Sequence, residues 1–174
     1  MRNVLQAAAA VATALAVSGA TSAKQPADEE ALISAAVVYN IARFSTWPDE
    51  GRAGERFFEI CFDQDSGMAD AFATIAGKEV SGRPVRPVPI DVRGAWDQRC
   101  HVYFTTRRDD DVLSIAIAQG SLTIGRDERF LRSGGAVRLR IEGKPRFSVN
   151  VRNAHAAGVY PSSKLLRLAE EVVE

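Results

Sequence analysis

The sequence is poor in the residues that most often carry catalysis or bind metals. It has only two cysteines and two histidines among 174 residues, whereas a structural metal site needs three or four ligands. No glycine-rich loop of the G-x-G-x-x-G or Walker type follows a predicted strand, and no G-x-S-x-G motif is present. We therefore expect no enzyme: no catalytic residues, no metal and no cofactor.

Net charge is also absent, since 22 Lys and Arg residues balance 22 Asp and Glu residues. Without a basic stripe the chain lacks the electrostatic signature of a nucleic-acid-binding protein. A hydrophobic fraction of 46% indicates a globular chain rather than a disordered one. After the first 23 residues no apolar run is long enough to enter a membrane.

The N-terminus carries the pattern of a secretory signal peptide. A positive start at Met1 and Arg2 is followed by an Ala-, Val- and Leu-rich segment from Val4 to Val17 and then by small residues. This predicts cleavage after Ala23, with Ala20 as the weaker alternative, and one domain spanning residues 24–174. A membrane anchor is the competing interpretation, but the apolar run is shorter than the ~20 residues of a spanning helix. We expect export to the periplasm without membrane insertion.

The two cysteines, Cys61 and Cys100, both lie in the predicted mature chain. In an exported protein an isolated pair is more typical of a disulfide than of a redox or metal site. The alternatives are a reactive thiol or a ligand set that includes His101, which directly follows Cys100. We interpret His101 as a core or edge histidine of a strand rather than as a catalytic residue.

Helical and strand patterns alternate through the first two thirds of the chain. Prolines in residues 83–89 indicate an edge or irregular strand, and residues 137–150 have the pattern of a hairpin with one solvated face. The prediction is a single-domain α/β sandwich with a mainly parallel or mixed sheet, helices on both faces and one antiparallel hairpin. The predicted helices are 31–44, 66–75, 109–119, 153–157 and 162–173, and the predicted strands are 57–62, 83–89, 101–104, 122–124, 137–141 and 146–150.

The first helix is apolar on nearly every face and ends at Trp47 and Pro48. Such a helix is buried on several sides, either within its own domain or against a partner. Tyr39, Phe44 and Trp47 are therefore candidate aromatics for the core or for an interface, because aromatic side chains bury much area at low entropic cost.

Acidic residues follow two of the predicted elements. Asp63 and Asp65 come directly after a strand, where α/β proteins often bind ligands, but they lack the pattern of a calcium loop. We expect a solvated turn there. The run from Asp109 to Asp111 predicts a capped helix start rather than a metal cluster.

Several motifs in order along the chain resemble the YfiR-like family of small exported bacterial regulators. The first helix carries the Y-x-x-x-K/R-F-x-x-W-P pattern, and Cys100-His101-Val102 matches the family's entry into a strand, with Cys61 as the implied mate. Further matching segments are Val80 with residues 82–85, residues 122–124, Phe130, residues 134–135, 146–147 and 149–150, and residues 162–169. The chain departs from the family at Asp63–Asp65, where glycine is usual, and at Gly125.

The resemblance implies a function based on binding. Family members are periplasmic α/β proteins, similar to repressors that bind the periplasmic sensor domain of an inner-membrane diguanylate cyclase and hold down cyclic-di-GMP synthesis. It implies two further partners: an outer-membrane peptidoglycan-binding lipoprotein that can sequester the regulator, and a second copy of the chain in a homodimer. The alternative is a periplasmic small-molecule sensor or accessory protein for a kinase or transporter, with a crevice near residues 63–66 and 105–109.

Overall fold

The computed structural model describes residues 26–47, 54–94, 96 and 99–174. The predicted signal peptide and Pro48 therefore lie outside the described residues. Within them, the chain forms a mixed α/β fold with one eight-stranded sheet and a separate two-stranded sheet. This confirms the predicted fold class.

The eight-stranded sheet has the order β10-β8-β7-β6-β5-β2-β4-β3. Its neighbouring strands are parallel except for the pairs β7/β8 and β3/β4. The strands are β2 (Phe58–Asp63), β3 (Glu79–Val80), β4 (Arg83–Ile90), β5 (Val102–Thr105), β6 (Leu122–Gly125), β7 (Val137–Glu142), β8 (Lys144–Asn150) and β10 (Glu171–Val173).

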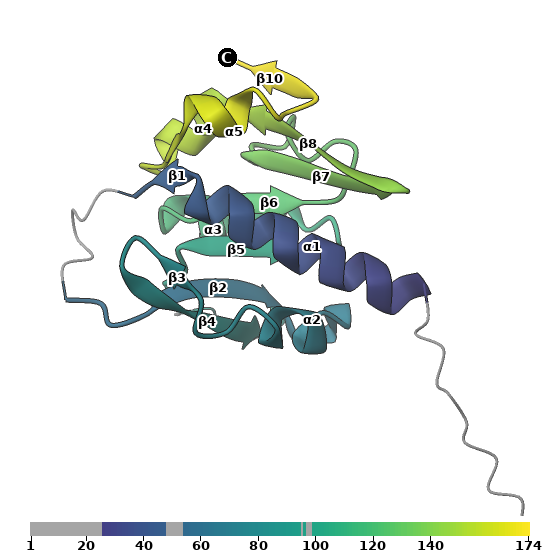
Figure 1. Cartoon of the computed structure of the whole chain (residues 1–174), viewed down its shortest axis with the longest axis vertical. Coiled ribbons are helices and arrows are strands. Elements are labelled where there is room, and N and C mark those ends of the chain that lie inside the picture. The colour runs from purple at the N-terminus through teal and green to yellow at the C-terminus, as the bar shows by residue number, and fades with distance from the viewer. Residues whose placement is uncertain (1–25, 48–53, 95, 97–98) are drawn as a thin grey trace, which may run out of the picture.

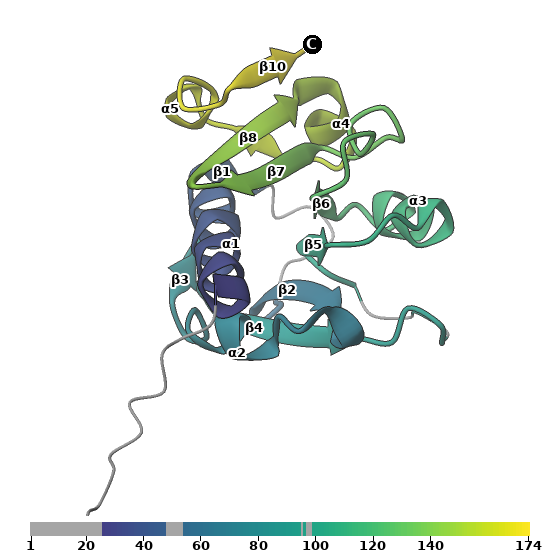
Figure 2. The same cartoon turned by 90° about the vertical axis from the view of Figure 1, so that its right-hand side faces the viewer.

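Helices cover both faces of this sheet. Helix α1 (Pro26–Arg43) runs across the front of the sheet in Figure 1, and Figure 2 places α3 (Asp110–Ala118) on the opposite face. A short 3-10 turn (Gln64–Ser66) leads into α2 (Ala69–Ala73), which packs against α1 and β4. Strands β1 (Ser45–Thr46) and β9 (Tyr160–Pro161) form the small antiparallel sheet, and α4 (Val151–Ala156) and α5 (Ser163–Leu166) complete the fold.

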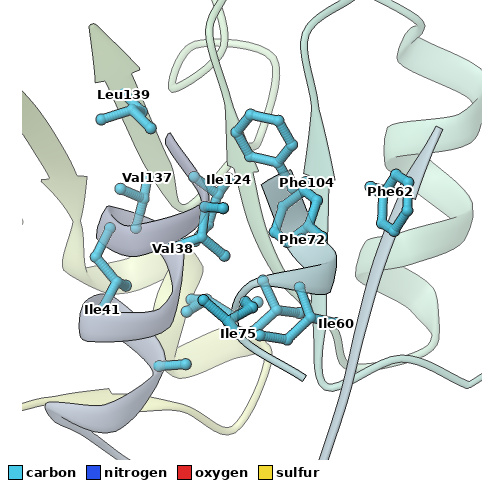
Figure 3. Packing of buried hydrophobic residues seen from close by; sticks show 14 of the residues in the cluster. Val38, Ile41, Ile60, Phe62, Phe72, Ile75, Phe104, Ile124, Val137 and Leu139 are labelled. Atoms are coloured by element: carbon cyan, nitrogen blue, oxygen red, sulfur yellow. The ribbon is translucent and has the colours of Figure 1, made fainter. Parts of the chain in front are cut away.

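The alternation of side chains along β2 divides the interior into two cores. Phe58, Ile60 and Phe62 belong to the larger core, which α1 and α2 close, and Figure 3 shows its central residues. Cys61 points to the other face, where it joins a smaller core beneath α3. Because both faces of β2 are covered, all six of its residues are buried.

Most sequence predictions of individual elements agree with the structure to within a few residues. The proline-rich segment forms β4, which is the second strand from one end of the sheet. The end strand, β3, pairs only with the first two residues of β4. Residues 128–134, between β6 and β7, form a series of turns. Asp109 caps α3 as expected, since its carboxylate accepts a hydrogen bond from the Val112 amide at 3.1 Å.

The predicted C-terminal helix over residues 162–173 is wrong. Helix α5 ends at Leu166, and the chain then turns into β10, which pairs in parallel with β8. The Glu170 amide donates to the Phe147 carbonyl at 2.8 Å, and the Glu170 carboxylate accepts hydrogen bonds from Arg140 and Arg146 at 2.9 and 3.0 Å. These contacts from a distant hairpin override the local helical preference of the segment.

Candidate functional site

Helix α1 presents one completely buried face to the sheet. Ala35, Val38, Ile41 and Ala42 are at most 1% exposed and pack within the larger core. Ser34 is buried among them, where its hydroxyl donates to the Glu30 carbonyl at 2.8 Å. This face is structural, because its side chains are already fully enclosed by the chain itself.

The opposite side of α1 carries three apolar residues and an asparagine that the fold leaves partly uncovered. Ile33, Ala36, Val37 and Asn40 follow one another at helical spacing, and we call them the outer stripe of α1. Ile33 and Val37 are half-buried, whereas Ala36 and Asn40 are exposed. Asn40 turns its amide back to the Ala36 carbonyl at 2.9 Å. The stripe carries no charged residue between the exposed Glu29 and Arg43, which lie one turn beyond its two ends, so it is a candidate interaction surface.

The flanks of the helix hold two of the three candidate aromatics. Tyr39 is half-buried against the larger core, its hydroxyl donates to the Glu79 carbonyl at 3.3 Å, and the Lys78 ammonium lies 5.3 Å from its ring centre. Phe44 is also half-buried, and cationic groups of Arg43 and Lys164 lie 5.8 and 4.9 Å from its ring centre. Both residues thus contribute to the core and keep part of their surface accessible.

The third aromatic, Trp47, lies just after α1 and packs back against the end of this helix and against Phe58. Its indole N–H donates to the Ala42 carbonyl at 2.8 Å, and its ring meets Phe58 edge to face with ring centres 4.8 Å apart. The ring of His101 lies close by, 6.2 Å from that of Trp47. Through these contacts Trp47 packs against the larger core. Its side chain is half-buried, so part of it stays accessible to solvent.

Cys61 and Cys100 form a disulfide, as the sequence predicted. The bond joins β2 to the residue before His101 and lies in the smaller core with Tyr103, Ile90 and Val112. Both cysteines are 0% exposed. The disulfide therefore links the sheet covalently beneath α3 and presents no accessible sulfur for catalysis.

His101 is fully buried and held at both ring nitrogens. The Glu59 amide donates to Nδ1 at 3.1 Å, and Nε2 lies 3.0 Å from the Glu55 carboxylate and 3.2 Å from the Arg83 guanidinium. Its ring stacks on Phe58 with centres 4.4 Å apart. This is the environment of a structural histidine, as expected from the sequence.

A surface cavity of about 400 Å³ lies at the amino end of β2 beside this histidine, and Glu55, Glu59 and Arg86 contribute to its wall. The charges of this wall are largely matched within the chain. Arg86 donates to the Glu59 carboxylate, and its guanidinium lies 4.6 Å from the ring centre of Phe57. Sequence patterns do not indicate this Glu59–Arg86 pair, because its members lie 27 residues apart.

The crevice expected at the carboxyl ends of β2 and β5 is closed. The predicted solvated turn at Asp63 is wrong, because its carboxylate is buried and accepts hydrogen bonds from the hydroxyls of Tyr103 and Thr105, the latter at 2.7 Å. Asp65 is exposed and pairs with Arg93 at 3.1 Å. The cavity beside Thr105 measures only about 10 Å³, room for a single water molecule.

Asp63 has a direct effect on its hydrogen-bonding partner. Burial raises the pKa of the Tyr103 hydroxyl far above its ordinary value, and the hydrogen bond to Asp63 and the negative charge of that carboxylate raise it further. Tyr103 therefore stays protonated and serves as a donor that the carboxylate needs. This arrangement supplies hydrogen bonds to a buried carboxylate.

Comparison with known families gives a clear result for this fold. A YfiR/HmsC-like family profile matches residues 31–170, from within α1 to the residue before β10. The chain belongs to the YfiR/HmsC-like family. A comparison with curated proteins found no significant match. Among the described residues, no helix is long and apolar enough to span a membrane.

Proposed function

We propose that this YfiR/HmsC-like protein is a non-enzymatic periplasmic regulator that binds the periplasmic sensor domain of an inner-membrane diguanylate cyclase. Binding lowers cyclic-di-GMP synthesis. The family match over residues 31–170 carries this proposal, since it covers nearly the whole described chain. The residues that the sequence offered for chemistry support it: His101, Asp63 and the two cysteines are all buried in structural roles.

The outer stripe of α1 is the surface that we assign to the cyclase. A regulator that acts by binding needs a surface with different affinities for two states of its partner, and it needs no reactive group. Ile33, Ala36 and Val37 provide apolar area on a helix that the core holds rigidly from its other side. A rigid helix pays little entropy on binding, which favours such a face for docking.

The assignment can be tested with charged substitutions on either side of the molecule. Val37→Glu places a carboxylate in the outer stripe, whereas Ile115→Glu places one on α3, on the opposite face, where Ile115 is 41% exposed. We expect Val37→Glu to abolish co-purification with the cyclase and to raise cellular cyclic-di-GMP to the level of a deletion strain. Ile115→Glu should behave as wild type.

Two results would contradict the proposal. Unchanged cyclic-di-GMP, biofilm and motility after deletion of the gene would exclude repression of a cyclase altogether. A folded Val37→Glu protein that still represses would exclude the outer stripe as the docking surface while leaving repression intact. A melting curve of each variant separates loss of binding from loss of folding.

Two further interactions belong to the same proposal. The family resemblance supports a homodimer, which sedimentation of the purified protein can establish. It also supports sequestration by an outer-membrane peptidoglycan-binding lipoprotein, which a pull-down from membranes can identify. A small-molecule sensor with a crevice at Thr105 has less support, because the cavity there measures only about 10 Å³.

A further inference from the structure

The C-terminal strand β10 forms part of the wall of a surface cavity. None of the described residues that line this cavity belongs to α1. The cavity measures about 490 Å³, within the range of ligand-binding pockets. Leu131 and Val173 form apolar parts of its wall, and Asn150 is one of its polar residues. It exists because residues 171–173 extend beside β8 instead of continuing α5.

The strand register fixes two opposite charges on either side of this cavity. Arg138 of β7 and Glu171 of β10 both lie opposite Ser148, the residue of β8 between them. Adjacent strands are separated by about 4.8 Å, so the backbones of Arg138 and Glu171 are roughly 10 Å apart. Ser148 is itself buried, whereas Arg138 and Glu171 on either side of it both line the cavity.

The loop between β6 and β7 supplies a second pair of opposite charges, Glu128 and Arg132. Within the described part of the chain, no ion pair within 4.0 Å joins any two of the four charged groups of the cavity. Arg138 donates a long hydrogen bond, 3.5 Å, to the Glu128 carbonyl. By contrast, Arg140, two residues further along β7, is bonded to Glu170 at 2.9 Å.

We propose that this cavity binds a short peptide with free ends. The peptide carboxylate would meet Arg138 and Arg132, its ammonium would meet Glu171 and Glu128, and an apolar side chain would contact Leu131 and Val173. Two cations and two anions around one space favour a ligand that carries both charges over a simple anion or cation. Separate charges on either side of Ser148 suit a ligand whose own charges lie several ångströms apart.

The test is a calorimetric titration of the purified protein with the tripeptide Ala-Leu-Ala. N-acetylation of the tripeptide removes its ammonium group, and C-terminal amidation removes its carboxylate. Inorganic phosphate serves as the simple anion. We expect saturable binding of the free tripeptide in a titration to about 10 mM, and loss of about tenfold or more in affinity for each blocked form.

Substitutions assign the binding to the cavity. Arg138→Gln and Glu171→Gln should each weaken binding of the free tripeptide about tenfold, the effect of losing one charge-assisted hydrogen bond. Arg138→Gln should reduce the preference for the free over the amidated tripeptide, because only Arg132 then remains to meet the carboxylate. The matched controls are Arg93→Gln and Glu142→Gln, which remove the same kinds of charge from exposed positions outside the cavity wall and should bind as wild type.

Four results would overturn the inference. One is the absence of saturable tripeptide binding in wild-type protein. Another is equal binding of the free and blocked peptides, and the third is unchanged affinity in both Arg138→Gln and Glu171→Gln. Stronger binding of phosphate than of the tripeptide would also count against it. Because the titration uses the isolated protein, its outcome does not depend on whether a cyclase is the physiological partner.

Discussion

Tyr103 should make the protein sensitive to alkaline pH. The hydroxyl is enclosed in the smaller core, where the residue is 1% exposed, and it donates to the buried Asp63 carboxylate. Ionisation in the folded state would place two negative charges next to each other away from water. In the unfolded chain the same hydroxyl ionises at its ordinary pKa of 10.0.

The size and sign of the effect follow from this difference. Above the ordinary pKa the unfolded state releases the Tyr103 proton while the folded state keeps it, so the free energy of unfolding falls as pH rises. The limiting slope is about 1.4 kcal/mol per pH unit for one group. The contribution of Tyr103 should therefore make the protein about 1.4 kcal/mol less stable at about pH 11 than at about pH 8.

Urea denaturation followed by tryptophan fluorescence across this pH range measures the effect. Tyr103→Phe should lower the free energy of unfolding by about 1 kcal/mol at neutral pH, because Asp63 loses a hydrogen-bond donor. Above about pH 10 the free energy of unfolding of this variant should fall less steeply with pH than that of the wild type; we call this part of the curve the alkaline limb. Tyr160→Phe is the matched control, since Tyr160 is 48% exposed and should leave the limb unchanged. Both cysteines are in the disulfide, so no free thiolate complicates the measurement. An equally steep limb in Tyr103→Phe would refute the reasoning.

Three further predictions concern stability. Cys61→Ser should lower the free energy of unfolding by about 2–4 kcal/mol, because the disulfide is lost. Detection of two free thiols in the non-reduced protein by mass spectrometry would contradict this prediction. Trp47→Ala should cost about 2 kcal/mol through lost contact with Phe58; a full loss of repression without a fall in melting temperature would instead make Trp47 an interface residue. Gly135→Ala should cost about 1–3 kcal/mol, because a Cβ there would lie 2.3 Å from the Phe130 ring. Gly94→Ala, which meets nothing closer than 3.5 Å, is its control, and equal melting temperatures would contradict the expected clash.

The sequence predicted those parts of the fold that local pattern determines. Strand β2 was recognisable because a compact apolar run suits a strand buried on both faces. Helix α3 was recognisable from its acidic start and from Gly120 after its end. The disulfide followed from the scarcity of cysteine in a chain with a signal-like N-terminus. None of these features needs knowledge of a distant contact.

Features that depend on distant contacts were missed. The turn into β10 is determined by the backbone of β8 and by Arg140 and Arg146, which nothing in residues 162–173 reveals. Asp63 is buried by hydroxyls that lie 40 and 42 residues away in the sequence. The cavity beside Glu171 could not be predicted either, since it requires β10. The candidate aromatics were found from sequence, but their half-buried positions became visible only in the folded chain.

The path of α1 across the sheet has a consequence for how the chain folds. Besides α2 and β3, the helix packs on β7 and β8, which follow it by about a hundred residues. Its buried face, with Val38 and Ile41, therefore stays uncovered in part until the hairpin at residues 137–150 has emerged. During this interval an apolar helix is available for aggregation or for capture by a chaperone. A chain truncated before residue 137 should accordingly be insoluble, even though it contains most strands of the parallel sheet.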